Sequence, residues 1–281
     1  METKFIESDP YSPIGYVYSM STKLFSVNSL QKIDVWQSPF FGKVLTCDGV
    51  VQVTERDEFI YHEMLAHVAL HSHVNPTSVL IVGGGDGGTL REVLKHECVS
   101  KVVMVEIDPE VINVAKQFFP SLSCGFSDER AQIIIADGAD YILQCKEKFD
   151  VILVDSTDPV GPAISLYDEE FFQNANNILT EQGLFVIQSE SIHFHLNIVQ
   201  EIQRKLAKCF PIRDLYTAPI ATYAGNWWTF SIASKAPVSR YPCNNVIKEC
   251  RYYAEDVHIS AYLPFSLFGK LNILEPTFNR L

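Results

Sequence analysis

The sequence predicts an α/β fold with a small antiparallel β-domain in front of it. From about residue 56 onward, near-continuous apolar strands alternate with amphipathic helices, which is typical of a parallel sheet covered on both faces. Before that point, short β-rich pieces alternate with turns. One apolar strand also runs directly into a glycine-rich loop that a helix follows, as at the crevice of an open α/β sheet.

Residues 1–55 are predicted to form the N-terminal β-domain. The dipeptide Asp48-Gly49 separates two β-rich runs and is a strong hairpin signal, because tight hairpin turns need residues that tolerate positive φ. The strand candidates of this small antiparallel sheet are 15–18, 23–28, 32–37, 43–46 and 50–54.

Residues 56–281 are predicted to form the second, Rossmann-like domain. Its apolar strands are expected at 79–82, 101–106, 132–135, 150–154 and 184–188. Its helices are expected at 58–71, 89–97, 109–118, 139–146, 169–179 and 196–209. Two further strands, 212–218 and 227–233, are expected to close the sheet as an antiparallel hairpin, and residues 244–271 are predicted to be C-terminal helices.

Composition and charge narrow the class of protein. The 34 acidic residues against 22 basic ones give a net charge of −12, which disfavours a nucleic-acid partner and suits a cationic substrate. No apolar run approaches the ~20 residues that span a bilayer, so no membrane association is expected. The N-terminus lacks a signal pattern, and the seven cysteines show no Cys-x-x-Cys spacing. We therefore expect a cytoplasmic protein with reduced thiols.

Three successive strands end in residues that suit a nucleoside site. The strand at 79–82 runs into GGGDGG at 83–88, whose glycines permit a tight turn and close approach of a ligand. Glu106 ends the next strand, where an α/β sheet places a carboxylate for ribose hydroxyls, and Asp137-Gly138 ends the third. A structural turn beside two ordinary surface acids would give the same pattern.

Asp86 restricts the kind of ligand that the loop can bind, because it places a negative charge inside the glycine-rich loop. A pyrophosphate prefers bare backbone N–H groups at a helix N-terminus and would be repelled by this carboxylate. An ammonium would be attracted. The loop therefore favours a nucleoside with a cationic tail over a dinucleotide, and tight NAD binding would contradict this interpretation.

Asp155 and Asp158 follow the strand at 150–154 and are candidates for chemistry on an amine. An alkyl ammonium has a pKa near ~10 and no lone pair, so its attack needs a base, and a second ammonium needs a fixed anion. Two close carboxylates can divide these tasks when their environments differ. An Asp-rich turn or helix cap would show the same spacing. Tyr61 and Tyr223 could add aromatic walls, although each taken alone is better explained by core or surface packing.

Several long motifs in order resemble the spermidine synthase family, with a bacterial-type His62 where animal members have glutamine. They are DGVVQVTERDE at 48–58, GGGDGG at 83–88, EID at 106–108, DG at 137–138 and DSTDPVGPA at 155–163. The resemblance runs from about Gln31 to the C-terminal helices. It implies a seven-stranded, methyltransferase-like Rossmann domain behind the small β-domain, usually as a homodimer or homotetramer. It implies no metal and no prosthetic group.

The family resemblance also implies roles for individual residues. The nucleoside of decarboxylated S-adenosylmethionine, the co-substrate, would be bound by Gln31, Gly83, Gly85, Asp86, Glu106, Asp137, Gly138 and Pro162, with Asp86 on its aminopropyl ammonium. Asp155 would deprotonate putrescine, aided by Tyr61 and Ser156. The remaining putrescine contacts would be Gln52, His62, Asp158, Glu190 and Tyr223. The loop from Pro159 to Tyr167 would be a mobile gate, and the products would be spermidine and methylthioadenosine.

Rival interpretations remain at this stage. The histidines at 62, 67, 71 and 73 suggest a metal site, but His62 and His67 would point about 140° apart on a helix. His67 and His71 share a face, and we expect no ligand cluster around them. An N-methyltransferase that uses S-adenosylmethionine would share the fold but would bring the methionine carboxylate against Asp86. A non-catalytic nucleoside-binding relative is disfavoured by the intact Asp155/Asp158 pair. Acceptors other than putrescine remain open.

Overall fold

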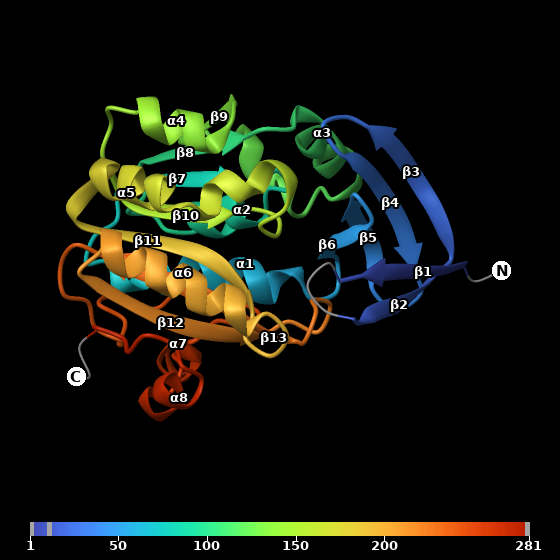
Figure 1. Ribbon diagram of the computed structural model, residues 1–281. Helices are drawn as coiled ribbons and strands as arrows, with labels where there is room; N and C mark the ends of the chain where they lie inside the picture. Colours follow the sequence, from blue (N-terminus) through green and yellow to red (C-terminus); the bar gives the residue numbers. More distant parts are fainter. Residues whose placement is uncertain (1–2, 10–12, 279–281) are drawn as a thin grey trace.

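A mixed sheet of seven strands lies at the centre of the part that the structure describes, residues 3–9 and 13–278 of this computed structural model (Figure 1). The strand order is β12-β13-β11-β10-β7-β8-β9. The parallel members are β7 (Ser78–Gly83), β8 (Lys101–Glu106), β9 (Ala131–Ile135), β10 (Phe149–Asp155) and β11 (Leu179–Ser191). The antiparallel strands β12 (Ile212–Pro219) and β13 (Trp227–Ser234) close one edge. The predicted fold class is confirmed.

Helices cover both faces of the sheet because the central strands are apolar on both sides. Ile81 and Met104 belong to a core on one face, whereas Leu80 and Val103 belong to a core on the other. On the first face lie α1 (Glu58–Ser72) and α2 (Gly88–Leu94). On the second lie α4 (Gly138–Gln144), α5 (Glu169–Ile178) and α6 (Leu196–Cys209).

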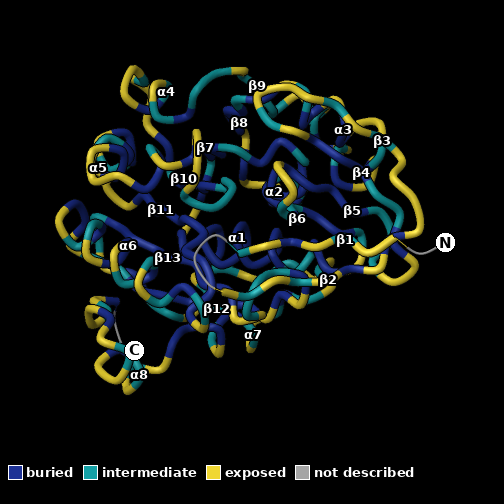
Figure 2. Tube along the Cα trace, turned by 45° about the vertical axis from the view of Figure 1, so that its right-hand side comes forward, coloured by how far each residue is buried: buried dark blue, intermediate teal, exposed yellow. Residues whose placement is uncertain are grey.

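Helix α1 is buried almost all round (Figure 2). The C-terminal segment packs against it. The Glu63 carboxylate accepts the backbone N–H groups of Arg251, Tyr252 and Tyr253, each at 2.8 Å. Those bonds hold the segment in a non-helical path, so the prediction of helices throughout 244–271 is wrong for 244–254. The C-terminal helices are α7 (Glu255–Ala261) and α8 (Phe265–Lys270).

The N-terminal part is antiparallel, as predicted. One sheet contains β3 (Thr22–Asn28), β4 (Lys32–Ser38), β5 (Gly42–Cys47) and β6 (Val50–Thr54). Asp48 and Gly49 connect β5 to β6 with φ values of 50° and 83°, which confirms the predicted hairpin. This sheet packs on α3 (Pro109–Phe118) through Ile33, Leu45 and Val114. The small sheet is thereby held against the open end of the large one.

A second, two-stranded sheet was not fully predicted. It pairs β1 (Thr3–Ser8) with β2 (Gly15–Met20). Strand β1 has no clear pattern of buried apolar residues, because Ile6 is exposed and pairs with Val17, which is also exposed. The division of the chain at residue 55 stays a prediction, and residues 1–2, 10–12 and 279–281 of the two predicted domains lie outside the described part.

Some boundaries differ from the predicted ones. Strand β11 begins at Leu179, five residues before the predicted start, because Leu179 pairs with Phe149 ahead of a register shift. Two short 3-10 helices, η1 (Ser123–Ser127) and η2 (Gly161–Tyr167), were not predicted. Among the described residues, no helix combines the length and apolar character needed to cross a membrane.

Candidate active site

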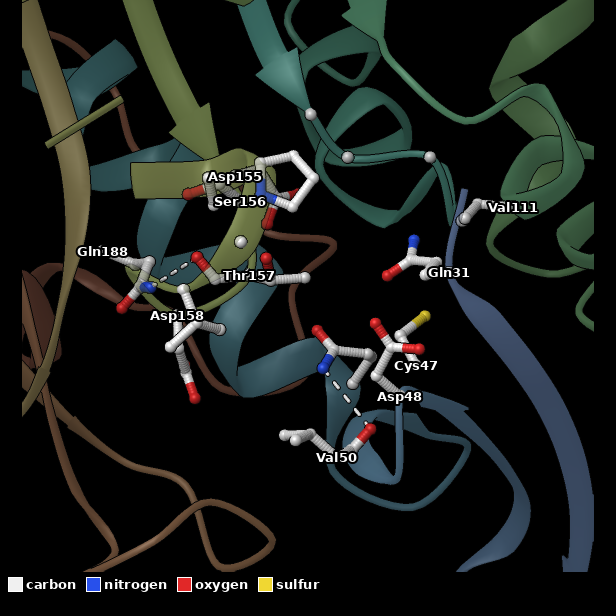
Figure 3. A pocket seen from close by; sticks show the side chains of 18 of the residues that line it. Gln31, Cys47, Asp48, Val50, Val111, Asp155, Ser156, Thr157, Asp158 and Gln188 are labelled. Atoms are coloured by element: carbon white, nitrogen blue, oxygen red, sulfur yellow. Dashed lines mark hydrogen bonds between the residues drawn. The ribbon is translucent and has the colours of Figure 1, made fainter. Parts of the chain in front are cut away.

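A cavity of about 450 Å³ opens at the carboxyl ends of the parallel strands, between the large sheet and the small N-terminal sheets. Parallel strands end at the same edge, so their loops converge there. Figure 3 shows Asp155, Ser156 and Asp158 on one side of the cavity and Gln31 and Asp48 on the other. The cavity is lined by every predicted site residue: Gln31, Gln52, Tyr61, His62, Gly83, Gly85, Asp86, Glu106, Asp137, Gly138, Asp155, Ser156, Asp158, Pro162, Glu190 and Tyr223.

The glycine-rich loop needs glycine because it passes directly against the end of β10. Gly83 has a φ of 83°, and a Cβ placed on it would lie 2.1 Å from the carbonyl oxygen of Asp155. The Gly84 N–H donates to that same oxygen at 2.8 Å. A Cβ on Gly85 would come within 2.8 Å of Oε2 of Glu106. The loop thus brings Asp86, Glu106 and Asp155 to one wall of the cavity.

Glu106 and Asp137 mark the end of the cavity predicted for the nucleoside. The Glu106 carboxylate accepts the N–H of Gly85 at 3.1 Å and that of Asp108 at 2.9 Å. Burial raises the pKa of Glu106 to about 7, against the effect of these bonds. Asp137 caps α4, since its Oδ1 accepts the N–H of Ala139 at 2.8 Å. Both carboxylates are therefore held in fixed orientations by main-chain donors.

Asp86 is paired with His62 beneath the loop. Nε2 of His62 lies 3.3 Å from Oδ1 of Asp86, and its Nδ1 lies 2.7 Å from Oε2 of Glu58. Burial alone would lower the pKa of His62, but these two carboxylates raise it well above its ordinary value. Burial by itself would raise the pKa of Asp86, but the charge and hydrogen bond of His62, the Gly88 N–H and the Arg91 charge together lower it. Asp86 is thus a carboxylate kept ionised at the cavity wall, as an ammonium ligand requires.

Asp155 has the environment of a general base. Thr89, the residue directly after the glycine-rich loop, donates its hydroxyl to Oδ2 of Asp155 at 2.6 Å. Burial and the charge of Asp86 raise the pKa of Asp155 to about 6, although His62, Thr89 and Tyr61 act in the opposite direction. A carboxylate with that pKa is ionised at neutral pH and is a better proton acceptor than an ordinary one. No role was predicted for Thr89. Its position directly after the glycine-rich loop is the feature of the sequence that could have indicated one.

Asp158 and Glu190 face the other end of the cavity. Burial and the neighbouring charge of Glu190 raise the pKa of Asp158 well above its ordinary value. Glu190 is fully buried and has a φ of 65° at a register shift of β11. The hydroxyl of Thr229 donates to the carbonyl oxygen of Glu190 at 2.8 Å and helps hold this bulge. Two carboxylates this close need a shared proton or a cation between them.

Aromatic side chains and a tyrosine-bound loop enclose the cavity. The rings of Tyr61 and Tyr223 meet edge to face at 5.7 Å, and Tyr223 donates its hydroxyl to the carbonyl of Gln52 at 2.6 Å. Ser156 and the hydroxyl of Tyr167 share a hydrogen bond of 3.2 Å, which ties η2 to the end of β10. The segment predicted to be a gate is therefore anchored to the site by Ser156.

Three residues at the end of the cavity that holds Asp158 and Glu190 were missed: Glu7, Asp9 and His195. Glu7 lies on β1, where its Oε2 accepts the N–H of Val51 at 3.1 Å, and burial raises its pKa to about 7. The first thirty residues match the family motifs poorly, and β1 had no strand signal. The packing of β1 beside β6 places Glu7 in the cavity.

The expectation that no ligand cluster surrounds His67 and His71 is wrong. His67 contacts Nε2 of His96 through Nδ1 and Oε2 of Glu92 through Nε2, both at 2.9 Å, and His71 lies beside them. Both ring nitrogens of His71 also have partners, from Asn244 and the backbone of residue 247. Such a satisfied network explains the buried histidines without an ion. The absence of a metal stays a prediction.

Family models match both parts of the chain. The spermine/spermidine synthase domain matches residues 58–242, and the spermidine synthase tetramerisation domain matches residues 4–55. Among curated relatives, polyamine aminopropyltransferase 1 of Aquifex aeolicus is 53% identical over 95% of this chain and 96% of its own. The polyamine aminopropyltransferase of Thermotoga maritima is 42% identical over 89% of this chain and 86% of its own.

Solved structures agree with these matches. A spermidine synthase crystallised with the transition-state analogue AdoDATO is 38% identical and superposes with a TM-score of 0.90 over 96% of this chain and 95% of its own. The spermidine synthase of Thermotoga maritima is 37% identical, with a TM-score of 0.87 over 97% and 95% of the two chains. These comparisons confirm the family resemblance inferred from the sequence motifs.

Proposed function

Because the chain belongs to the spermine/spermidine synthase family of aminopropyltransferases, we propose that it transfers the aminopropyl group of decarboxylated S-adenosylmethionine to putrescine. The products are spermidine and methylthioadenosine. The observation that carries this proposal is the carboxylate Asp155, with a pKa raised to about 6, between the ionised Asp86 and the Asp158/Glu190 pair.

The cavity has a wall for each part of the two substrates. Glu106 and Asp137 line the end that suits a nucleoside, and Asp86 suits the ammonium of the aminopropyl group. Asp158 and Glu190 suit the distal ammonium of the acceptor. The complex of a related spermidine synthase with AdoDATO supports a donor of this kind.

Asp155 acts as the base in the proposed reaction. It removes a proton from the near ammonium of putrescine, and the freed lone pair attacks the methylene carbon bound to the sulfonium. The new C–N bond forms as the C–S bond breaks, and the bonding electrons return to sulfur, which leaves as methylthioadenosine. Correct alignment of nitrogen, carbon and sulfur contributes ~7–11 kcal/mol in a well-oriented case. The packed rings of Tyr61 and Tyr223 form a wall of the cavity beside Asp155.

A product analysis tests the proposal. The purified protein is incubated with putrescine and with either decarboxylated or ordinary S-adenosylmethionine, and products are identified by mass spectrometry. We expect spermidine and methylthioadenosine from the decarboxylated donor only. N-methylputrescine from the ordinary donor would instead identify a methyltransferase, and conversion of cadaverine or agmatine in preference to putrescine would change the acceptor.

The acceptor reaction should depend on pH through Asp155. Because only the ionised carboxylate can take the proton, kcat/KM for putrescine at saturating donor is expected to fall about tenfold per pH unit below about 6 and to level off above it. Thr89→Val removes a hydrogen bond that lowers the pKa of Asp155, so its inflection should move to higher pH. An unchanged inflection in this variant would assign the titration to another group, such as Glu7.

The oligomeric state follows from the family as part of the same proposal. The tetramerisation-domain match at residues 4–55 supports a homo-oligomer, either a dimer or a tetramer. Light scattering coupled to size-exclusion chromatography distinguishes the two from a monomer of 31.7 kDa.

A further inference from the structure

The acceptor end of the cavity holds more carboxyl groups than one ammonium requires. Glu7 and Asp9 reach it from β1 and the residue after it, and Asp158 and Glu190 reach it from the large sheet. Burial raises the pKa of Asp158, and the other three carboxylates, Glu190, Glu7 and Asp9, raise it further. His195, directly before α6, is the basic side chain among them.

His195 bridges two of these carboxylates. Its Nε2 lies 2.7 Å from Oδ2 of Asp9, and its Nδ1 lies 3.0 Å from Oε2 of Glu190. A neutral imidazole carries a proton on only one nitrogen, whereas both of these nitrogens face carboxylate oxygens. The protonated ring satisfies both. Burial by itself would lower the pKa of His195, but Glu190 and Asp9 raise it above its ordinary value.

Glu190 depends on this contact for its orientation. Its backbone is fixed, since its N–H donates to Oε1 of Gln188 at 3.0 Å and its φ is 65°. Its carboxylate is fully buried, lies 3.0 Å from Nδ1 of His195 through Oε2 and also shares a hydrogen bond with the Asp158 carboxyl. The ion pair with His195 therefore holds one oxygen of Glu190, and a cation can replace the proton that Glu190 shares with Asp158.

We propose that His195 is a positioning residue that orients Glu190 toward the distal ammonium of the acceptor and, through its own positive charge, favours diamines over longer polyamines. This inference rests on the proposed function. The charge count supports the second part. The protonated His195 supplies one positive charge among the carboxyl groups of Glu7, Asp9, Asp158 and Glu190. Removing it leaves an additional carboxylate uncompensated, and the further ammonium of a triamine can then take its place.

Two substitutions at one position separate orientation from charge. His195→Phe removes both donors, so KM for putrescine is expected to rise about 10- to 100-fold while kcat stays within about twofold. His195→Gln keeps one donor for Glu190 without the charge, so KM should recover in part. In both variants the ratio of kcat/KM for spermidine, offered as a triamine acceptor, to that for putrescine should rise about tenfold. His193→Phe, an exposed histidine two residues earlier, is the matched control and should behave as the parent.

The outcomes distinguish the inference from the function on which it rests. If the parent protein converts putrescine but both His195 variants keep its KM and its acceptor ratio, the inference is overturned and the proposed function stands. A parallel loss of donor affinity would assign His195 a general structural role and would also overturn it. A parent protein that does not convert putrescine would refute the proposed function itself. If His195→Phe does not fold, the acceptor ratio of His195→Gln decides the question.

Discussion

Asp155→Asn is expected to lower turnover by about two to four orders of magnitude and to leave nucleoside binding almost unchanged. The amide keeps the size of the side chain and can still contact the Thr89 hydroxyl, but it cannot accept a proton from the attacking amine. Single-turnover measurements with saturating donor and putrescine would report the chemical step directly. Methylthioadenosine affinity, measured by calorimetry, would report the nucleoside end of the cavity.

An exposed carboxylate provides the control for this substitution. Asp140 lies on α4 outside the cavity, so Asp140→Asn makes the same chemical change and should retain parental turnover. Near-normal turnover in Asp155→Asn would remove Asp155 from the role of base. A large loss of nucleoside affinity in the same variant would indicate that the carboxylate organises the glycine-rich loop instead, through its contact near Gly84.

The second large effect is expected on stability. Gly83→Ala should destabilise the fold by about 3 kcal/mol or more, because two costs add. The first is a φ of 83°, which disfavours any residue with a Cβ. The second is steric, since the new Cβ would lie 2.1 Å from the carbonyl oxygen of Asp155, and both atoms belong to backbone that cannot rotate away. Urea denaturation followed by circular dichroism measures the change.

Gly49→Ala separates these two costs. Gly49 has the same φ of 83°, but nothing lies within 4 Å of a Cβ placed on it. It should therefore lose only about 1–2 kcal/mol, the cost of the backbone conformation alone. Equal losses in the two variants would mean that the loop relaxes around the new methyl group and that the close approach of β7 and β10 is not needed for stability.

Much of the site followed from local sequence because its chemistry lies at strand ends. A short apolar run that ends in glycine or a carboxylate places that residue at the carboxyl edge of a parallel sheet, whatever the rest of the chain does. Asp86, Glu106, Asp137 and Asp155 all lie at such ends and all line the cavity. Asp48-Gly49 is equally local, since a tight hairpin turn needs residues that accept positive φ.

Other features depended on contacts between distant segments. Residues 244–254 follow a non-helical path because the buried Glu63 carboxylate binds three successive N–H groups there, a partner almost two hundred residues away. The contact between His67 and His96 likewise joins two separate segments, α1 and the residues just after α2. Periodicity reports which face of an element is apolar, but it cannot report which polar group will meet that face.

The sequence by itself determined the fold class, the carboxylates Asp86, Glu106 and Asp137 at the strand ends and the pair Asp155/Asp158, because each is set by residues close together in the chain. Only the tertiary structure decided the acceptor end. There, Asp9 from the N-terminal segment contacts His195, which lies about 190 residues further along and in turn contacts Glu190. The pKa values of His195 and of Asp155 were likewise decided by folding, because burial and neighbouring charge exist only once the sheets have packed together.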